Sequence, residues 1–189
     1  MSNDKRQCLN CGNAVTGNYC EKCGQSVHTS RIGGRHLVEE LQYGLLHVNK
    51  GLFFTLRELL VVPGHAIRGY LAGKRVEYTK PFIYLIIWGT LYSLVFHIFH
   101  FSPIEEMNKG ENTLLEYIPL YKWYTRHFAL GQLLIIPFFA LATRLVFRQK
   151  GYNYIEHLVL FSYINGTKVF VLLLLYPLVY VVESNFIYR

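Results

Sequence analysis

The sequence predicts an all-α integral membrane protein with a small cysteine-rich ribbon at its N-terminus. One observation is the stretch from Pro81 to Phe101, which carries no formal charge and is long enough for a helix to cross the ~30 Å hydrocarbon core of a bilayer. A second is composition, since 52% of the chain is hydrophobic and only 16% is charged. A third is that all four cysteines precede residue 24. We expect four parts: a ribbon (1–25), a flexible linker (26–35), amphipathic interfacial helices (36–80) and a transmembrane domain (81–189).

The four cysteines form two Cys-x-x-Cys-Gly pairs, Cys8 with Cys11 and Cys20 with Cys23. In each pair the glycine lets the backbone turn, so that two thiolates point at one ion. Four thiolates in a closed tetrahedral site are typical of structural zinc, and we predict one Zn²⁺ per chain in a zinc-ribbon knuckle. The alternative, two disulfides or a redox pair, suits a doubled knuckle in the reducing cytosol less well. So short a segment needs the metal for its folding energy.

The ribbon also suggests a class of partner. We expect residues 13–18 to form the tip of a small hairpin. Lys5, Arg6 and Lys22 could touch a phosphate backbone, but three cations without interleaved aromatic residues are a thin footprint for nucleic acid. Docking of the ribbon onto a cytosolic protein is therefore the favoured interpretation.

Residues 36–62 carry apolar side chains at steps of three or four, which predicts amphipathic helices with a break at 49–51. A further short helix is expected from Pro63 to Ala72, because proline suits a first helical turn and Gly73 a stop. Such helices either lie in the headgroup layer or pack on the membrane helices under the ribbon. Four basic residues are expected to contact anionic headgroups: Arg68, Lys74, Arg75 and Lys80.

This juxtamembrane segment resembles an uncharacterised family of small bacterial membrane proteins that share a PGxxIRxYLxGKRxxYxxP motif. The matching residues are Lys50 to Leu60, Pro63-Gly64, Ile67-Arg68-Gly-Tyr70-Leu71, Gly73-Lys74-Arg75 and Tyr78-Thr-Lys-Pro81-Phe82. Those proteins also open with a zinc ribbon ending in CGQ, as Cys23-Gly24-Gln25 does here. The resemblance covers roughly residues 8–165. It implies a domain of unknown function in a bacterial inner membrane. The family has no established activity that could be carried over to this chain.

Three spans are expected, at about 81–101, 128–147 and 158–182. Residues 1–80 carry eleven Lys or Arg against six Asp or Glu, whereas residues 102–127 carry three against four. The positive-inside rule then places the N-terminus in the cytoplasm and the C-terminus outside. No apolar core occupies residues 1–18, so no cleavable signal peptide is expected.

Polar residues inside the apolar unit have two interpretations each. Lys168, beside Asn165 and Thr167, lies close to mid-membrane if the third span starts near Leu158, and reaches the inner headgroups if the span is shifted toward the C-terminus. His97 and His100, with His127 nearby, could bind a metal or haem, although histidine is also common at membrane interfaces.

The sequence carries no HExxH, GxSxG or phosphate-binding glycine loop, and Glu156 and His157 are adjacent on a helix and so point apart. We therefore expect no enzyme. The leading hypothesis is a membrane adaptor whose ribbon recruits or senses a cytosolic partner. The alternative is a homo-oligomeric pore or membrane-perturbing effector, in a setting such as bacterial defence, that is gated through the ribbon.

Overall fold

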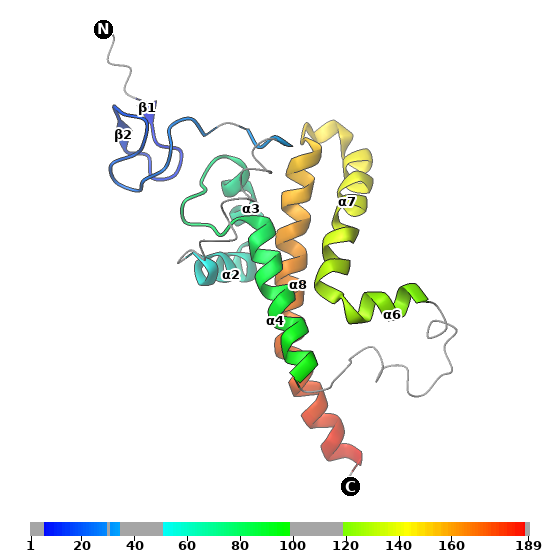
Figure 1. Cartoon of the computed structure of the whole chain (residues 1–189). Helices are drawn as coiled ribbons and strands as arrows, with labels where there is room; N and C mark the ends of the chain where they lie inside the picture. Colours follow the sequence, from blue (N-terminus) through cyan, green and yellow to red (C-terminus); the bar gives the residue numbers. More distant parts are fainter. Residues whose placement is uncertain (1–5, 30, 35–50, 99–118, 188–189) are drawn as a thin grey trace.

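The computed structural model describes residues 6–29, 31–34, 51–98 and 119–187 (Figure 1). These parts are mostly helical, with one small two-stranded sheet at the N-terminal end. The elements in chain order are β1 (Arg6–Gln7), β2 (Ala14–Val15), α2 (Leu52–Val61), α3 (Pro63–Leu71), α4 (Pro81–Ile98), α6 (Pro119–Arg126), α7 (Phe128–Val146), the short 3₁₀ helix η2 (Arg148–Lys150) and α8 (Tyr154–Ile187).

The ribbon is built from two small hairpins. Strands β1 and β2 are antiparallel, with Arg6 opposite Val15, and an isolated bridge joins Tyr19 to Ser26. Each hairpin closes around one Cys-x-x-Cys pair. The prediction that residues 13–18 form a hairpin tip was wrong, because β2 lies within that segment and the turns are made by the cysteine knuckles themselves.

Helix α8 is the axis of the helical unit and runs unbroken from Tyr154 to Ile187, starting before the predicted residue 158 (Figure 1). Helix α4 runs parallel to it. Successive contacts join Tyr84 to Gly166, whose Cβ position lies 2.6 Å from the Tyr84 ring, and Trp88 to Phe170, with ring centroids 4.5 Å apart.

Helix α7 runs antiparallel to α8 along its first half. Thr143 Oγ1 lies 3.2 Å from His157 Nδ1, and the rings of Phe139 and Phe161 are 5.8 Å apart. The two partner helices are therefore displaced along α8: α7 accompanies its N-terminal half, and α4 begins only near Tyr163, whose hydroxyl donates to Thr79 O.

Two described helices are long and apolar enough to cross a membrane, Phe128–Val146 and Tyr154–Leu175. They correspond to the second and third predicted spans. The first predicted span forms α4, whose apolar part, Pro81–Val95, is shorter, and the predicted end at Phe101 lies outside the described residues. The described helices thus support two spans.

The predicted helix from Pro63 is confirmed as α3, and α2 precedes it; residues 35–50 lie outside the described part. Helices α3 and α4 both pack on α8 through edge-to-face aromatic contacts. Tyr70 of α3 meets Tyr163 of α8 at 5.4 Å, and Tyr163 meets Tyr84 of α4 at 5.8 Å. All three tyrosines are at most 1% exposed, so they form the centre of the core.

Candidate metal centre

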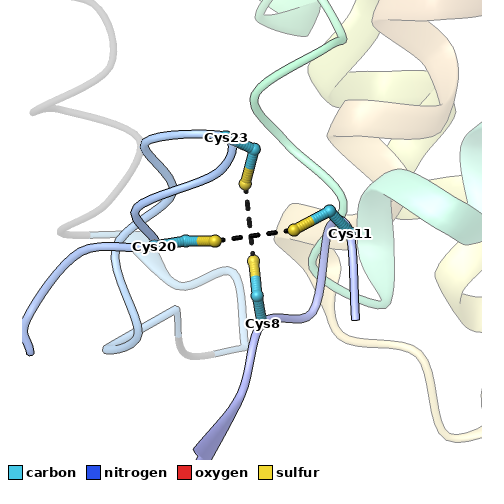
Figure 2. A group of neighbouring side chains, drawn as sticks. All are labelled: Cys8, Cys11, Cys20 and Cys23. Atoms are coloured by element: carbon cyan, nitrogen blue, oxygen red, sulfur yellow. Dashed lines mark hydrogen bonds between the residues drawn. The ribbon is translucent and has the colours of Figure 1, made fainter. Parts of the chain in front are cut away.

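The four cysteine sulfurs converge on one point between the two knuckles (Figure 2). All four Sγ atoms lie within 4.8 Å of one another, and the pairs Cys8–Cys23 and Cys11–Cys20 are each 3.5 Å apart. A tetrahedron of sulfurs about 2.3 Å from a central ion has edges of roughly 3.8 Å. The cysteines are free thiols, and their arrangement fits a four-sulfur metal site.

The two knuckles have the same backbone geometry. The N–H of Cys8 donates to Asn13 O and the N–H of Cys20 to Gln25 O, five residues ahead in both cases. Gly12 and Gly24 then donate back to the carbonyl of the first cysteine at 2.8 Å, with φ of 71° and 75°. Side chains other than glycine rarely adopt this left-handed conformation, so both glycines are required by the turn.

The thiols of Cys20 and Cys23 have different pKa values in this arrangement. The backbone N–H of Cys23 lowers the pKa of Cys20 to about 7, while burial raises the pKa of Cys23 to about 12. A central cation would hold all four as thiolates, because a metal displaces the thiol protons. With four protein sulfurs around it, such an ion keeps no open position for a substrate.

The ribbon is fixed to the loop between α3 and α4 by Gln25, the residue that follows the second knuckle. Its Nε2 donates to Gly73 O at 2.8 Å, and its Oε1 accepts from the N–H of Arg75 at 3.1 Å. Gln25 is only 4% exposed. One amide thus pairs with two backbone groups of a loop 48 to 50 residues away.

Gly73 allows the first knuckle to approach the same loop. A Cβ added to Gly73 would lie 2.8 Å from Leu9 Cδ1, and its φ of +110° is one that side chains other than glycine rarely adopt. Leu9 lies between the two cysteines of the first pair. Both knuckles therefore contact this loop, one through Gln25 and the other through Leu9.

A second attachment joins the segment after the ribbon to the start of α8. Arg31 donates to both carboxylate oxygens of Glu156, at 2.8 and 2.7 Å, and this carboxylate raises the pKa of Arg31 above its ordinary value. Glu156 also accepts from the N–H of Asn153, and Asn153 Oδ1 accepts in return from the N–H of Glu156, a reciprocal cap on α8. Ile32 is 2% exposed in the core. The composition of the predicted flexible linker did not indicate these contacts.

The four basic residues predicted to contact lipid lie around α3 and the following loop. Arg68 and Lys74 are exposed, and Arg75 and Lys80 are half-buried. The Arg75 guanidinium lies over the Tyr70 ring, 5.9 Å from its centroid. Lipid contact by these residues stays a prediction.

The predicted intramembrane polar residues are separated by the structure. Thr167 Oγ1 pairs with the Tyr84 hydroxyl at 3.1 Å, between α8 and α4, and Asn165 donates to Phe161 O of its own helix. Lys168 is exposed and lines a cavity of about 320 Å³ beside Leu59 and Pro63, where α2 meets α3.

The histidines are not gathered with other ligands in the described part of the chain, where the four cysteines form the only group of three or more metal-binding side chains. His127 stacks on Trp123 and donates from Nδ1 to Trp123 O at 3.1 Å. His97 lies near the end of α4, and His100 falls outside the described residues.

Sequence reasoning missed the residues that attach the ribbon: Leu9, Gln25, Arg31, Gly73 and Glu156. Two signals were present. Gln25 belongs to the CGQ sequence quoted for the resemblance, and Asn153-x-x-Glu156 has the spacing of a helix cap. Neither signal indicates which distant residues Gln25 and Glu156 contact in the folded chain.

No curated protein and no solved structure matches the chain significantly. Residues 49–93 match the sequence profile of a family described as "Protein of unknown function (DUF3667)". The matched residues include α2, α3, the Gly73–Arg75 loop and most of α4, and the match is consistent, over this part of the chain, with an uncharacterised family.

Proposed function

We propose that this protein is a non-enzymatic membrane adaptor whose zinc ribbon, on the cytoplasmic side, recruits or senses a protein partner. The attachment of the ribbon to the Gly73–Arg75 loop carries the proposal. That loop leads within a few residues to Pro81, the start of α4. A partner that binds the ribbon would therefore also affect the loop that leads into α4.

Zinc is the metal we propose, at one ion per chain. Four thiolates select soft or borderline metals, and a tetrahedral four-sulfur site suits zinc or iron. The ribbon's own core is small, with Cys8, Val15 and Cys20 as its buried apolar residues among those described. A redox-inert structural ion that supplies folding energy fits this segment best.

Membrane location is supported by the surface of α7. Its exposed side chains are large and apolar, and they would be costly to leave in water: Leu130, Leu134, Phe138, Phe139, Leu141, Leu145 and Val146. We propose that α7 and α8 cross a bacterial inner membrane and that residues 81–101 form a third span. The cytoplasmic end then holds the ribbon, and the basic residues near α3 contact anionic headgroups.

The exposed side of the ribbon offers a surface to a protein partner. Tyr19 is 67% exposed next to the ligand Cys20, and Glu21 and Lys22 are exposed beside it. Aromatic residues with a polar tip are enriched in protein interfaces. The cations of the ribbon remain too few for nucleic acid to be the favoured partner.

The alternative is an oligomeric pore lined by Thr167 and Lys168. The pairing of Thr167 with Tyr84 inside one chain favours the adaptor, because that hydroxyl is already used between α4 and α8. The position of Lys168 beside the α2–α3 junction also favours an interfacial lysine, since that junction is flanked by Arg57, Glu58 and His65.

Two measurements on the full chain test the adaptor. The first places a photo-crosslinking residue at Tyr19 in native membranes, with Ala14 on the neighbouring strand as the control position. We expect an adduct with one cytosolic protein from position 19 that disappears with Cys23→Ser. The second measures mass and conductance after reconstitution. A ring of four or more copies that conducts ions would overturn the adaptor in favour of the pore.

A further inference from the structure

Helix α2 is apolar on two faces, of which only one is packed on the rest of the protein. Its inner face is buried through Thr55, Leu56 and Leu59. At about 3.6 residues per turn, the residues between these positions fall on the opposite side of the helix. That side, the outer face of α2, consists of the exposed residues Phe53, Phe54, Arg57, Leu60 and Val61.

The outer face is too apolar to be left in water. Phe53 and Val61 are 75% and 70% exposed, and each lies one helical turn from Arg57. A helix whose apolar residues surround it is typical of a segment enclosed by protein or lipid, because large apolar side chains gain free energy when they leave water. The ten residues of α2 are about 15 Å long, too short to cross a bilayer. We therefore looked for a cover that lies beside the helix.

Two contacts fix α2 at the entry of α4. Thr55 Oγ1 accepts a hydrogen bond from the N–H of Thr79 at 2.8 Å, two residues before α4 begins at Pro81. The ring of Phe54 meets the ring of Tyr78 edge to face, with centroids 5.3 Å apart. Helix α2 accordingly lies beside the start of α4 (Figure 1). This is the level at which the first predicted span would enter a membrane.

The C-terminal half of α2 reaches α8 within the stretch that α7 accompanies. Leu59 and Tyr163 of α8 line the same cavity of about 320 Å³. Helix α7 meets α8 through Phe139 and Phe161, closer to the start of α8 than Tyr163, and it exposes large apolar side chains along its length. The level of α2 thus lies within the apolar length of α7. A bilayer that covers the exposed face of α7 also reaches the outer face of α2.

The charges around α2 suit the surface of an anionic leaflet. Arg57 on the outer face is exposed, and so is Lys168, which lines the cavity beside Leu59. Long basic side chains can leave their stems among apolar groups and extend the charge to the headgroups. Burial, with the charges of Glu58 and Glu77, raises the pKa of Tyr78, so both acids lie near that ring, at the margin of the face. The centre of the outer face carries no carboxylate.

We infer that the outer face of α2 lies in the cytoplasmic leaflet, with its four large apolar side chains against lipid acyl chains and the Arg57 guanidinium at the headgroups. Amphipathic helices in this position are buried about 5–10 Å into the boundary between headgroups and acyl chains. The inference rests on the membrane location proposed above and adds a lipid contact outside the spans. It also explains why α2 needs two apolar faces: one holds the helix on the protein, and the other holds it in the leaflet.

The test measures the depth of single positions in the full chain, loaded with its metal and reconstituted in vesicles of phosphatidylcholine and phosphatidylglycerol. A nitroxide is attached to p-acetylphenylalanine placed at Phe53 or at Val61, so that the cysteines remain available to the metal. Collisions with oxygen, which concentrates in hydrocarbon, and with a neutral nickel chelate, which stays in water, give the depth of the label. Leu134 on the exposed face of α7 is the hydrocarbon reference, and Gln7 on exposed β1 is the water reference.

We expect both α2 labels about 5–10 Å below the headgroup boundary, with oxygen-to-nickel collision ratios closer to that of Leu134 than to that of Gln7. Labels on α2 in water while Leu134 is in hydrocarbon would overturn the inference and leave the membrane location intact. Labels on α2 shielded from both reagents would show that protein covers the face, and would also overturn it. Leu134 in water would overturn the inference together with the membrane location. If the label at one α2 position costs the protein its metal, the other position decides.

Discussion

The ribbon and the helical unit reach their folded states by different means. In the ribbon, the two cysteine pairs lie within sixteen consecutive residues, Cys8 to Cys23, and few apolar side chains are buried. In the helical unit, α3, α4 and α8 meet through buried aromatic rings from distant parts of the chain, such as Tyr70 and Tyr163. We therefore propose that the ribbon needs an ion to fold, whereas the helices have their own core. The Gly73–Arg75 loop connects the two regions, because Gln25 of the ribbon is hydrogen-bonded to it.

The largest expected effect is loss of the metal, which should unfold the ribbon and leave the helical unit folded. Cys8→Ser and Cys23→Ser should each lower the metal content from about one ion per chain to near zero and leave the ribbon unfolded, because apparent binding energies of structural zinc reach about 10–16 kcal/mol. The helical content should not change. Metal analysis, limited proteolysis and circular dichroism check this.

Lys22→Ser, in the same knuckle but not a ligand, is the control and should keep its metal. Recovery of metal-free protein with a folded, protease-resistant ribbon would show that the ribbon does not depend on an ion.

The next effect concerns the contact between the regions. Gly73→Ala should cost about 1–3 kcal/mol, because alanine is strained at a φ of +110° and its Cβ would crowd Leu9. Gly69→Ala is the matched control: it lies inside α3 with Lys74 Cδ 3.8 Å away, so alanine should stabilise the helix by roughly 0.5–1 kcal/mol. Thermal unfolding of the metal-loaded protein compares them. Equal stability of the two variants would contradict both the left-handed backbone at Gly73 and its close contact with Leu9.

A smaller effect is expected at Gln25. Gln25→Ala leaves Gly73 O and the Arg75 N–H without their partner, at a cost of about 1–2 kcal/mol because the loop is only partly exposed to water. Hydrogen exchange at the Arg75 amide should accelerate while the metal stays bound. Gln7→Ala, on exposed β1, should change neither quantity. Unchanged hydrogen exchange at the Arg75 amide would contradict the hydrogen bond between Gln25 and this loop.

The smallest effect is expected at Lys168. A lysine at mid-membrane costs at least ~2.5–3.5 kcal/mol in insertion, so Lys168→Leu would then improve insertion by a similar amount. Because Lys168 lies beside the α2–α3 junction, we expect Lys168→Leu to change the insertion free energy by less than about 1 kcal/mol. We also expect it to leave the conductance unchanged. An insertion assay measures the first quantity, and current recordings on reconstituted wild type and variant measure the second. A wild-type current abolished by this one substitution would establish the pore.

The elements that follow local rules could be predicted from the sequence. Metal-ligand spacing gave Cys8, Cys11, Cys20 and Cys23, and apolar runs gave α7 and α8 to within a few residues. The interactions that join these elements could not be predicted. Gln25 meets its partners 48 and 50 residues away, and Arg31 meets Glu156 across 125 residues. No periodicity encodes such pairs.

His157 illustrates the same limit. Reasoning along one helix predicts that the side chains of Glu156 and His157 point apart, and the two side chains take different partners, Arg31 and Thr143. It could not show that α3 would pack opposite and enclose a cavity there.

The unbroken course of α8 makes it a lever. From Tyr154 to Pro177 the helix is roughly 34 Å long, so a tilt of about 5° at the Arg31–Glu156 end displaces the other end by roughly 3 Å. Pro177 has no N–H to donate to the carbonyl one turn earlier, so α8 lacks one hydrogen bond of its ladder at this position. We predict that a pull on the ribbon, transmitted through Arg31 and Glu156, moves the C-terminal end of α8 sideways.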